Sequence, residues 1–189
     1  MMDEALRHCV APGLDLVPLR RELAPALFAL TEEYRSDLAR WLPWPNKVRQ
    51  LADTEAYIAQ MLLLLAQRQA MQFAIEMDGQ VIGVCGFNKW SRRLARGELG
   101  YWLAPPWRGK GVITGCCRWL CAYGFITLGL QQMQIAAATG NLASRAVCER
   151  LGMRLHVQVA AAEQLDHGLV DHAIYRLSRS EWEQTCQRS

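Results

Sequence analysis

Apolar residues repeat along this chain at two different spacings, which predict helices in some stretches and strands in others. Spacing of three and four residues covers 22–38 and predicts a helix there, after a first strand at 14–19. A second helix is predicted from an N-cap at Asp53 to about residue 69. Residues 41–45 contain two prolines and interrupt the helical pattern, so they are expected to connect the two helices.

The rest of the chain alternates between β-rich runs and helical segments. Asp78-Gly79 separates two apolar runs, a pattern typical of a β-hairpin. The predicted strands cover residues 73–77, 81–87, 98–103, 133–138, 157–160 and 172–177. A helix follows Gly111, and its predicted inner face holds Ile113, Cys116, Cys117, Leu120 and Cys121. This order predicts one mixed sheet with flanking helices, an α/β or α+β fold, in a single domain over residues 1–189.

Two further helices are marked by residues that cap helix ends. Asn141 is a good N-cap for a helix that Gly152 ends. Ser178 and Glu181 have the spacing of a capping box at the start of a short last helix.

Composition limits the class of protein and its partners. Hydrophobic residues make up 51% and charged residues 21%, as in ordinary globular proteins. The net charge of +3 is small and its cations are scattered, which argues against direct binding of nucleic acid. The seven cysteines include no Cys-x-x-Cys pair and no zinc-type spacing with histidine. We therefore expect reduced thiols and no metal site.

Nothing in the sequence points to a membrane. Asp3 and Glu4 precede any apolar run, so no secretory leader is expected. The most apolar run, residues 61–66, is far too short to span a bilayer. These features predict a cytoplasmic protein.

Residues 100–113 combine the end of a strand, two prolines and a glycine-rich cationic turn at the start of a helix. The first backbone N–H groups of a helix and its dipole together attract anions. Gly109 and Gly111 would let an anion approach the backbone, and Arg108 and Lys110 add positive charge. We expect the anion to be a pyrophosphate, although an ordinary turn with two solvated cations has the same sequence pattern.

A second motif lies forty residues further on, at 141–153. It contains Asn141, Ser144 and a final Leu-Gly-Met. With the first motif, in this order and at this distance, it resembles the GNAT family of acetyl-CoA-dependent N-acetyltransferases. Arg108 and Gly111 fit the family's Gln/Arg-x-x-Gly-x-Gly/Ala motif, whereas Ile113 stands where Gly or Ala is usual. Met153 replaces the phenylalanine of the family's Leu-Gly-Phe.

The resemblance is closer still to the RimJ/RimL-like branch, which acetylates the N-termini of ribosomal proteins. The residues that carry it are Trp41-Leu42-Pro43-Trp44-Pro45, Gly100-Tyr101-Trp102-Leu103, Glu163, Asp171 and Tyr175. The family fold implies a sheet that splays between the strands at 98–103 and 133–138. It also implies acetyl-CoA as cofactor and no metal.

The resemblance assigns roles to residues in both motifs. The implied cofactor-binding residues are Tyr101, Trp102, Leu103, Arg108, Gly109, Lys110, Gly111, Val112, Ile113, Thr114, Asn141 and Ser144. The Leu103 N–H is the expected oxyanion donor, and Ser144 would give a hydrogen bond or a proton to the leaving thiolate. Asn141 would act both as a helix cap and as a partner of the cofactor arm.

Two carboxylates compete for the role of general base. Glu163 matches a glutamate of the RimL-like branch and is favoured, although its pattern also fits an exposed loop residue. Glu98 begins a strand and is the alternative, with solvation at the strand start as its simplest interpretation. Trp41 and Trp44, with Glu98, are expected on the acceptor side.

The acceptor is predicted from amine chemistry. An α-amine has a pKa near 8 and a lysine side chain one near 10.4, so far more of an α-amine is neutral at pH 7. This favours the N-terminal amine of a protein, in the RimL-like branch a ribosomal one. An enzyme acting on a small amine (a polyamine, an amino acid or an antibiotic) and a non-catalytic acyl-CoA-binding protein remain alternatives. The sequence also leaves a homodimer open.

Overall fold

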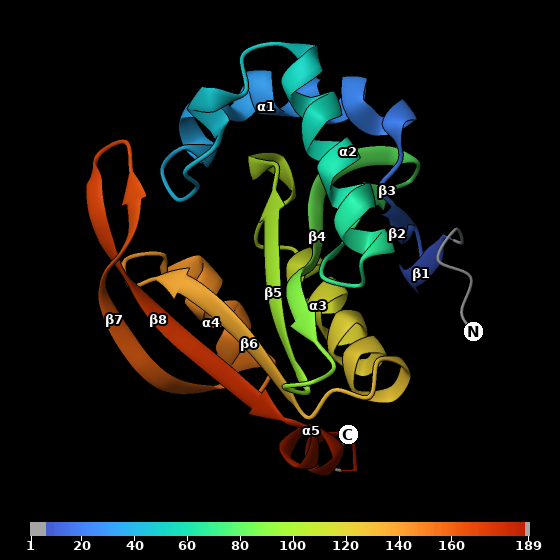
Figure 1. Ribbon diagram of the computed structural model, residues 1–189, viewed down its shortest axis with the longest axis vertical. Helices are drawn as coiled ribbons and strands as arrows, with labels where there is room; N and C mark the ends of the chain where they lie inside the picture. The colour runs from blue at the N-terminus through green and yellow to red at the C-terminus, as the bar shows by residue number, and fades with distance from the viewer. Residues whose placement is uncertain (1–6, 188–189) are drawn as a thin grey trace.

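Eight strands form one sheet in the order β1-β2-β3-β4-β5-β6-β8-β7 (Figure 1). The computed structural model describes residues 7–187, so Asp3 and Glu4, which carry the expectation about a leader, lie outside the described residues. The strands are β1 (His8–Ala11), β2 (Leu14–Pro18), β3 (Met71–Met77), β4 (Gln80–Ser91), β5 (Arg96–Leu103), β6 (Gln132–Ala138), β7 (Arg154–Leu165) and β8 (Gly168–Ser178). The helices are α1 (Ala24–Leu38), α2 (Leu51–Ala66), α3 (Val112–Ala122), α4 (Leu142–Arg150) and α5 (Arg179–Cys186).

The pairing of the strands confirms the predicted mixed, mostly antiparallel sheet. β5 and β6 pair in parallel, and every other neighbouring pair is antiparallel. Helices α1 and α2 cover one face and α3 and α4 the other, each layer with its own apolar cluster (Figure 1). Tyr101 packs with the α3–α4 cluster and Trp102 with the α1–α2 cluster, because successive side chains of a strand point to opposite faces.

The sheet opens between β5 and β6, as predicted. Their pairing runs from Arg96 with Gln132 to Leu99 with Ile135 and ends there. Beyond this point β5 stays paired with β4, and β6 stays paired with β8. The ends of the two central strands therefore diverge and leave a gap.

Several predicted boundaries are wrong for identifiable reasons. The short strand β1 was not predicted, and β7 and β8 extend well beyond 157–160 and 172–177. β7 is an edge strand that is exposed on both faces for most of its length, so it lacks the alternation that marks a half-buried strand. Glu163 consequently lies inside β7, whereas the predicted strand ended at residue 160.

Asp53 is not the N-cap of α2. Gln50 caps this helix, and Asp53 is the third residue of a capping box that reaches back. Its carboxylate accepts hydrogen bonds from the backbone N–H groups of Arg49 and Gln50, at 2.8 and 3.1 Å, and these bonds hold the pKa of Asp53 below its usual value. The predicted cap at Asn141 and the capping box of Ser178 and Glu181 are both confirmed.

The cysteines are free thiols, as expected. All seven lie within residues 7–187, and Cys85, Cys116, Cys117, Cys121 and Cys148 are buried. Within the same residues, none of the helices combines the length and apolar character needed to cross a membrane.

Phe87 provides a test of the hydrophobic core. Its side chain is fully buried, and its ring lies 6.2 Å from that of Trp90 and 6.4 Å from that of Tyr123, between centroids. Phe87→Ala should lower the free energy of unfolding by about 3–5 kcal/mol, because it leaves a cavity in close-packed surroundings. Urea denaturation followed by tryptophan fluorescence measures this loss. Leu63→Ala, at an exposed position of α2, should change stability by about 0.5 kcal/mol or less. Equal losses in the two variants would contradict this account of the core.

Candidate active site

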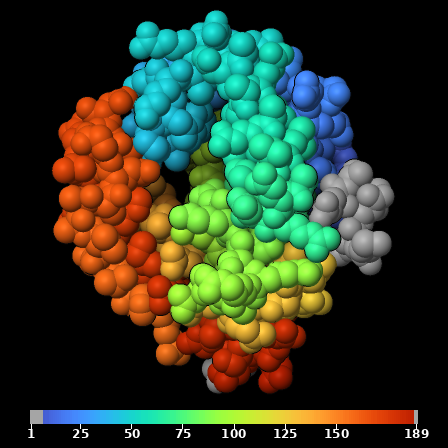
Figure 2. Space-filling view, viewed as in Figure 1, coloured from blue at the N-terminus to red at the C-terminus, as the bar shows by residue number. Residues whose placement is uncertain are grey.

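A cavity of about 1430 Å³ lies at the gap between β5 and β6. Figure 2 shows its opening as a hollow between the β7–β8 hairpin in orange and the α1–α2 region in blue-green. The predicted site residues that line it are Trp41, Trp44, Glu98, Tyr101, Trp102, Leu103, Arg108, Gly109, Gly111, Val112, Ile113, Thr114, Asn141, Ser144 and Glu163. Of the predicted set, Lys110 is not part of the lining. Its Nζ lies 5.1 Å from the centre of the Trp107 ring.

The N-terminus of α3 forms a cradle of backbone N–H groups at one end of this cavity. Gly111 is the N-cap with φ of 77°, and Gly109 has φ of 74°, a left-handed conformation that favours glycine. The first helical bond runs from Gly115 N to Gly111 O, so the N–H groups of residues 112–114 precede the helical ladder. A Cβ built on either glycine would meet no atom within 4 Å. The space beside the two glycines is therefore open, and N–H groups at the start of a helix could hold a phosphate-type anion there.

The Arg108 side chain is engaged elsewhere. Its Nε donates to the Leu103 carbonyl at 3.1 Å, and its Nη2 lies 2.5 Å from Asp37 Oδ1 at the end of α1. The guanidinium thus connects the end of β5 to the end of α1. In this arrangement the cradle consists of backbone groups.

Backbone groups of β5 face the gap. Ala104 N donates to Ile82 O at 2.9 Å, which fixes the alternation of the ladder between β4 and β5. The N–H groups of Tyr101 and Leu103 therefore point away from β4 and into the gap. An extended ligand arm that enters the gap would find these groups without a partner strand.

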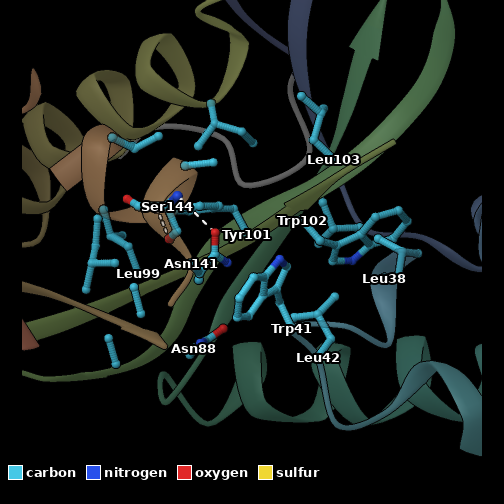
Figure 3. A pocket seen from close by; sticks show the side chains of 18 of the residues that line it. Leu38, Trp41, Leu42, Asn88, Leu99, Tyr101, Trp102, Leu103, Asn141 and Ser144 are labelled. Atoms are coloured by element: carbon cyan, nitrogen blue, oxygen red, sulfur yellow. Dashed lines mark hydrogen bonds between the residues drawn. The ribbon is translucent and has the colours of Figure 1, made fainter. Parts of the chain in front are cut away.

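Ser144 and Tyr101 form a pair of hydroxyls beside the gap (Figure 3). Asn141 Oδ1 accepts a hydrogen bond from Ser144 N at 3.1 Å, which fixes the first turn of α4. Ser144 Oγ then lies 2.9 Å from Tyr101 Oη. Burial raises the pKa of Tyr101 well above its usual value, so its phenol stays protonated and can donate. The predicted strand included Tyr101, but the contact of its hydroxyl with α4 depends on tertiary packing.

Glu163 faces His172, for which no functional role was predicted. Glu163 Oε2 lies 3.3 Å from Nε2 of His172 on β8, and both residues line the cavity. Val159 pairs with His172 and Glu163 with Val170, with a bulge between the two pairs. The contact therefore arises from the irregular register of the hairpin, which sequence spacing does not reveal.

Glu98 lies in the part of β5 that is still paired with β6. Its Oε2 accepts a hydrogen bond from Gln134 Nε2 at 3.2 Å, and Arg176 Nε donates to Gln134 Oε1 at 3.1 Å. Side chains of neighbouring strands thus hold this carboxylate, whereas Glu163 lies toward the turn of the β7–β8 hairpin.

The connection between α1 and α2 covers the other side of the cavity. The Trp44 ring lies 5.7 Å from that of Trp102, between centroids. A Cβ built on Gly140 would lie 3.4 Å from Trp41 Cη2, so the Trp41 indole reaches the turn before α4. Asn46 Nδ2 donates to Asp166 Oδ2, which joins this connection to the turn between β7 and β8.

Comparison with known proteins identifies the family of this chain. Residues 14–154 match the sequence profile of the acetyltransferase (GNAT) domain. YdaF of Bacillus subtilis (strain 168), named provisionally as a ribosomal N-acetyltransferase, is 31% identical over 162 residues, which cover 85% of this chain and 88% of YdaF. The ribosomal-protein-serine acetyltransferase of Escherichia coli (strain K12) is 26% identical over 166 residues, or 88% of this chain and 93% of that protein.

Solved structures give the same result for the fold. The RimL ribosomal L7/L12 α-N-protein acetyltransferase, solved in complex with coenzyme A, superposes with a TM-score of 0.89. The superposition covers 93% of this chain and 99% of RimL, at 23% identity. The family profile covers most of this chain, and the match to YdaF covers 85% of it. The chain therefore belongs to the GNAT family and is an N-acetyltransferase, with relatives named as ribosomal-protein acetyltransferases.

Proposed function

We propose that this enzyme transfers an acetyl group from acetyl-CoA to the N-terminal α-amine of a protein, and that the protein is a ribosomal one. One observation carries the proposal: a single cavity joins the N–H cradle of α3, the hydroxyl of Ser144, the Glu163–His172 pair and the tryptophans of the α1–α2 connection. The names of the relatives support a ribosomal acceptor. Such an acceptor would place the reaction in the cytoplasm.

Acetyl-CoA would supply the acetyl thioester. Its pyrophosphate fits the open cradle at Gly109, Gly111 and the first turn of α3, where the dipole of the helix adds to the N–H donors. The β5 backbone at Tyr101 and Leu103 would hold the extended arm of the cofactor in the gap. The Leu103 N–H is then available to stabilise negative charge as it develops on the reacting carbonyl oxygen.

Ser144 is the proposed donor to the leaving thiolate. A thiol has an ordinary pKa of about 8.5, so protonation or a hydrogen bond helps it to leave. Because Tyr101 remains neutral, it can donate to Ser144 Oγ and leave the serine proton free to point at the sulfur.

Glu163 is the proposed base, acting on the α-amine directly or through water. His172 lies beside it and would fix the orientation of its carboxylate. An α-amine with a pKa near 8 is roughly one-tenth neutral at pH 7, so the base has a modest task.

The cradle is tested by Gly111→Val. A β-branched residue at this φ is strained, and its Cβ would occupy the space proposed for the pyrophosphate. Titration calorimetry with coenzyme A should show binding lost or weakened by at least about 10², since the loss of several charge-assisted hydrogen bonds is involved. Gly129→Val is a matched control. Gly129 also has positive φ, 70°, with nothing within 4 Å of its Cβ, and it lies outside the cavity lining. Unchanged coenzyme A affinity in Gly111→Val would refute the cradle.

The role of Ser144 predicts a particular kinetic change. Ser144→Ala should lower kcat by about 10²-fold, with a smaller effect on KM, because its bond strengthens as the thiolate leaves. Steady-state thiol release with a peptide acceptor measures both constants. Ser180→Ala, at an exposed serine of α5, serves as the control. Wild-type turnover in Ser144→Ala would leave this serine with a structural role as part of α4.

The assignment of the base predicts a pH-dependent defect. Glu163→Gln should lower kcat/KM at pH 7 and recover partly above about pH 8, where the α-amine becomes neutral without assistance. Glu98→Gln, whose carboxylate is held by Gln134, should follow the wild-type profile. The measurement is kcat/KM against pH for both variants with one peptide. A large loss in Glu98→Gln, with Glu163→Gln near normal, would reverse the assignment.

A further inference from the structure

Asn88 projects from an irregularity of β4 into the acceptor side of the cavity. Phe87 pairs with Leu99 and Lys89 with Glu98, so Asn88 is the extra residue of a bulge. Bulges redirect side chains and are common next to active sites. Asn88 is exposed and lines the cavity, where Figure 3 shows it among the labelled side chains together with Trp41 and Tyr101.

Two glycines make room for this side chain and for its partner. Gly86 and Gly100 are paired in the register of β4 and β5. A Cβ on Gly100 would lie 2.3 Å from Asn88 Nδ2, and one on Gly86 would lie 2.1 Å from Met71 O and 2.9 Å from Gln72 Oε1. The two amide side chains therefore fill a shallow trough in the sheet. Gly100 shares its strand face with Trp102, so the trough lies on the face covered by α1 and α2.

Gln72 fixes the orientation of the Asn88 amide. Gln72 is only 9% exposed, and its Nε2 donates to Asn88 Oδ1 at 3.0 Å. A buried amide is costly unless it is hydrogen-bonded. The bond to Asn88 therefore offsets part of the cost of burying the Gln72 amide. With Oδ1 occupied by Gln72, the Nδ2 group of Asn88 is the part of the amide left to donate toward a ligand.

The position of the trough relates it to the reacting amine. Gly100 is the first residue of β5 beyond the pairing with β6, so Asn88 lies where the gap begins. In a peptide N-terminus the amine nitrogen and the first carbonyl oxygen are separated by three bonds, a distance of about 3 Å from standard geometry. An amine held at the gap would therefore bring its own carbonyl within reach of the trough.

We propose that the Gln72–Asn88 pair is a recognition site for the first carbonyl group of the acceptor, with Asn88 Nδ2 as the donor and Gln72 as the residue that positions it. The inference rests on the proposed function and narrows it, because it separates peptide N-termini from amines that carry no neighbouring carbonyl. Alkylamines, polyamines and lysine side chains would leave the Asn88 donor unpaired. Discrimination arises in this way when a site's polar groups go unsatisfied.

A cycle of enzyme and substrate changes tests the contact. Wild type and Asn88→Ala are assayed with two peptides that differ in one atom, the first carbonyl oxygen or a sulfur in its place, since sulfur is the weaker hydrogen-bond acceptor. Asn88→Ala should lower kcat/KM for the oxygen peptide by about 10-fold, the effect of one hydrogen bond. Wild type should prefer the oxygen peptide, and Asn88→Ala should lose that preference, which measures the coupling of the two groups.

Further variants separate recognition from folding. Gln72→Leu should weaken the preference for the oxygen peptide while Asn88 is still present, as expected for a positioning residue. Gln80→Ala, at an exposed amide at the start of β4, is the matched control and should keep wild-type values. Coenzyme A affinity should be unchanged in all three variants, which shows that the fold and the cradle are intact.

The outcomes distinguish this inference from the proposed function. Wild-type kcat/KM in Asn88→Ala, or an equal loss on both peptides, would overturn the recognition site while peptide acetylation stands. A wild-type enzyme that acetylates neither peptide but acetylates simple amines would overturn the proposed acceptor and the recognition site together.

Discussion

The backbone of β5 loses its neighbour on one side after Leu99, and the arrangement of the site follows from that loss. In a continuous sheet each N–H group of an inner strand has a partner in the adjacent strand. Here the N–H groups of Tyr101 and Leu103 face a gap, while β5 stays paired with β4 and β6 stays paired with β8 as far as Ala138. Ala104 makes the last bond to β4, and Pro105 and Pro106 after it lack N–H groups, so the ladder ends before the cradle of α3. Each of the two strands thus keeps its outer neighbour along the gap, although the two strands no longer pair with each other.

The two faces of the sheet contribute different chemistry to this gap. The α3–α4 face brings backbone N–H groups and the hydroxyls of Ser144 and Tyr101. The α1–α2 face brings amides, carboxylates and tryptophans. Arg108 connects the two, since it contacts both Leu103 and Asp37. The end of β5 and the end of α1 are therefore joined through one side chain.

Local signals in the sequence were sufficient for three of the helix starts. Gly111, Asn141 and the Ser178–Glu181 box each determine a helix start within a few residues, and the structure has helices at all three. Most of the site residues that were predicted from the same signals line one cavity. What the sequence could not provide depends on register. The contact of Glu163 with His172 needs the bulge in β7, and the Gln72–Asn88 pair needs the bulge in β4 and two facing glycines. Both arise from pairing between strands, for which a single sequence carries little information.

The buried thiols behind the gap have a redox consequence. Cys148 donates to the Ser144 carbonyl at 3.4 Å, so a cysteine lies next to the place where the proposed reaction releases coenzyme A as a free thiol. Burial raises the pKa of Cys148 and of Cys121 to about 12, which leaves almost no thiolate at neutral pH. Disulfide exchange requires a thiolate, so these cysteines are poor partners for a mixed disulfide with the product. Cys9 and Cys186, which are exposed, are the thiols that oxidants and thiol reagents would reach first.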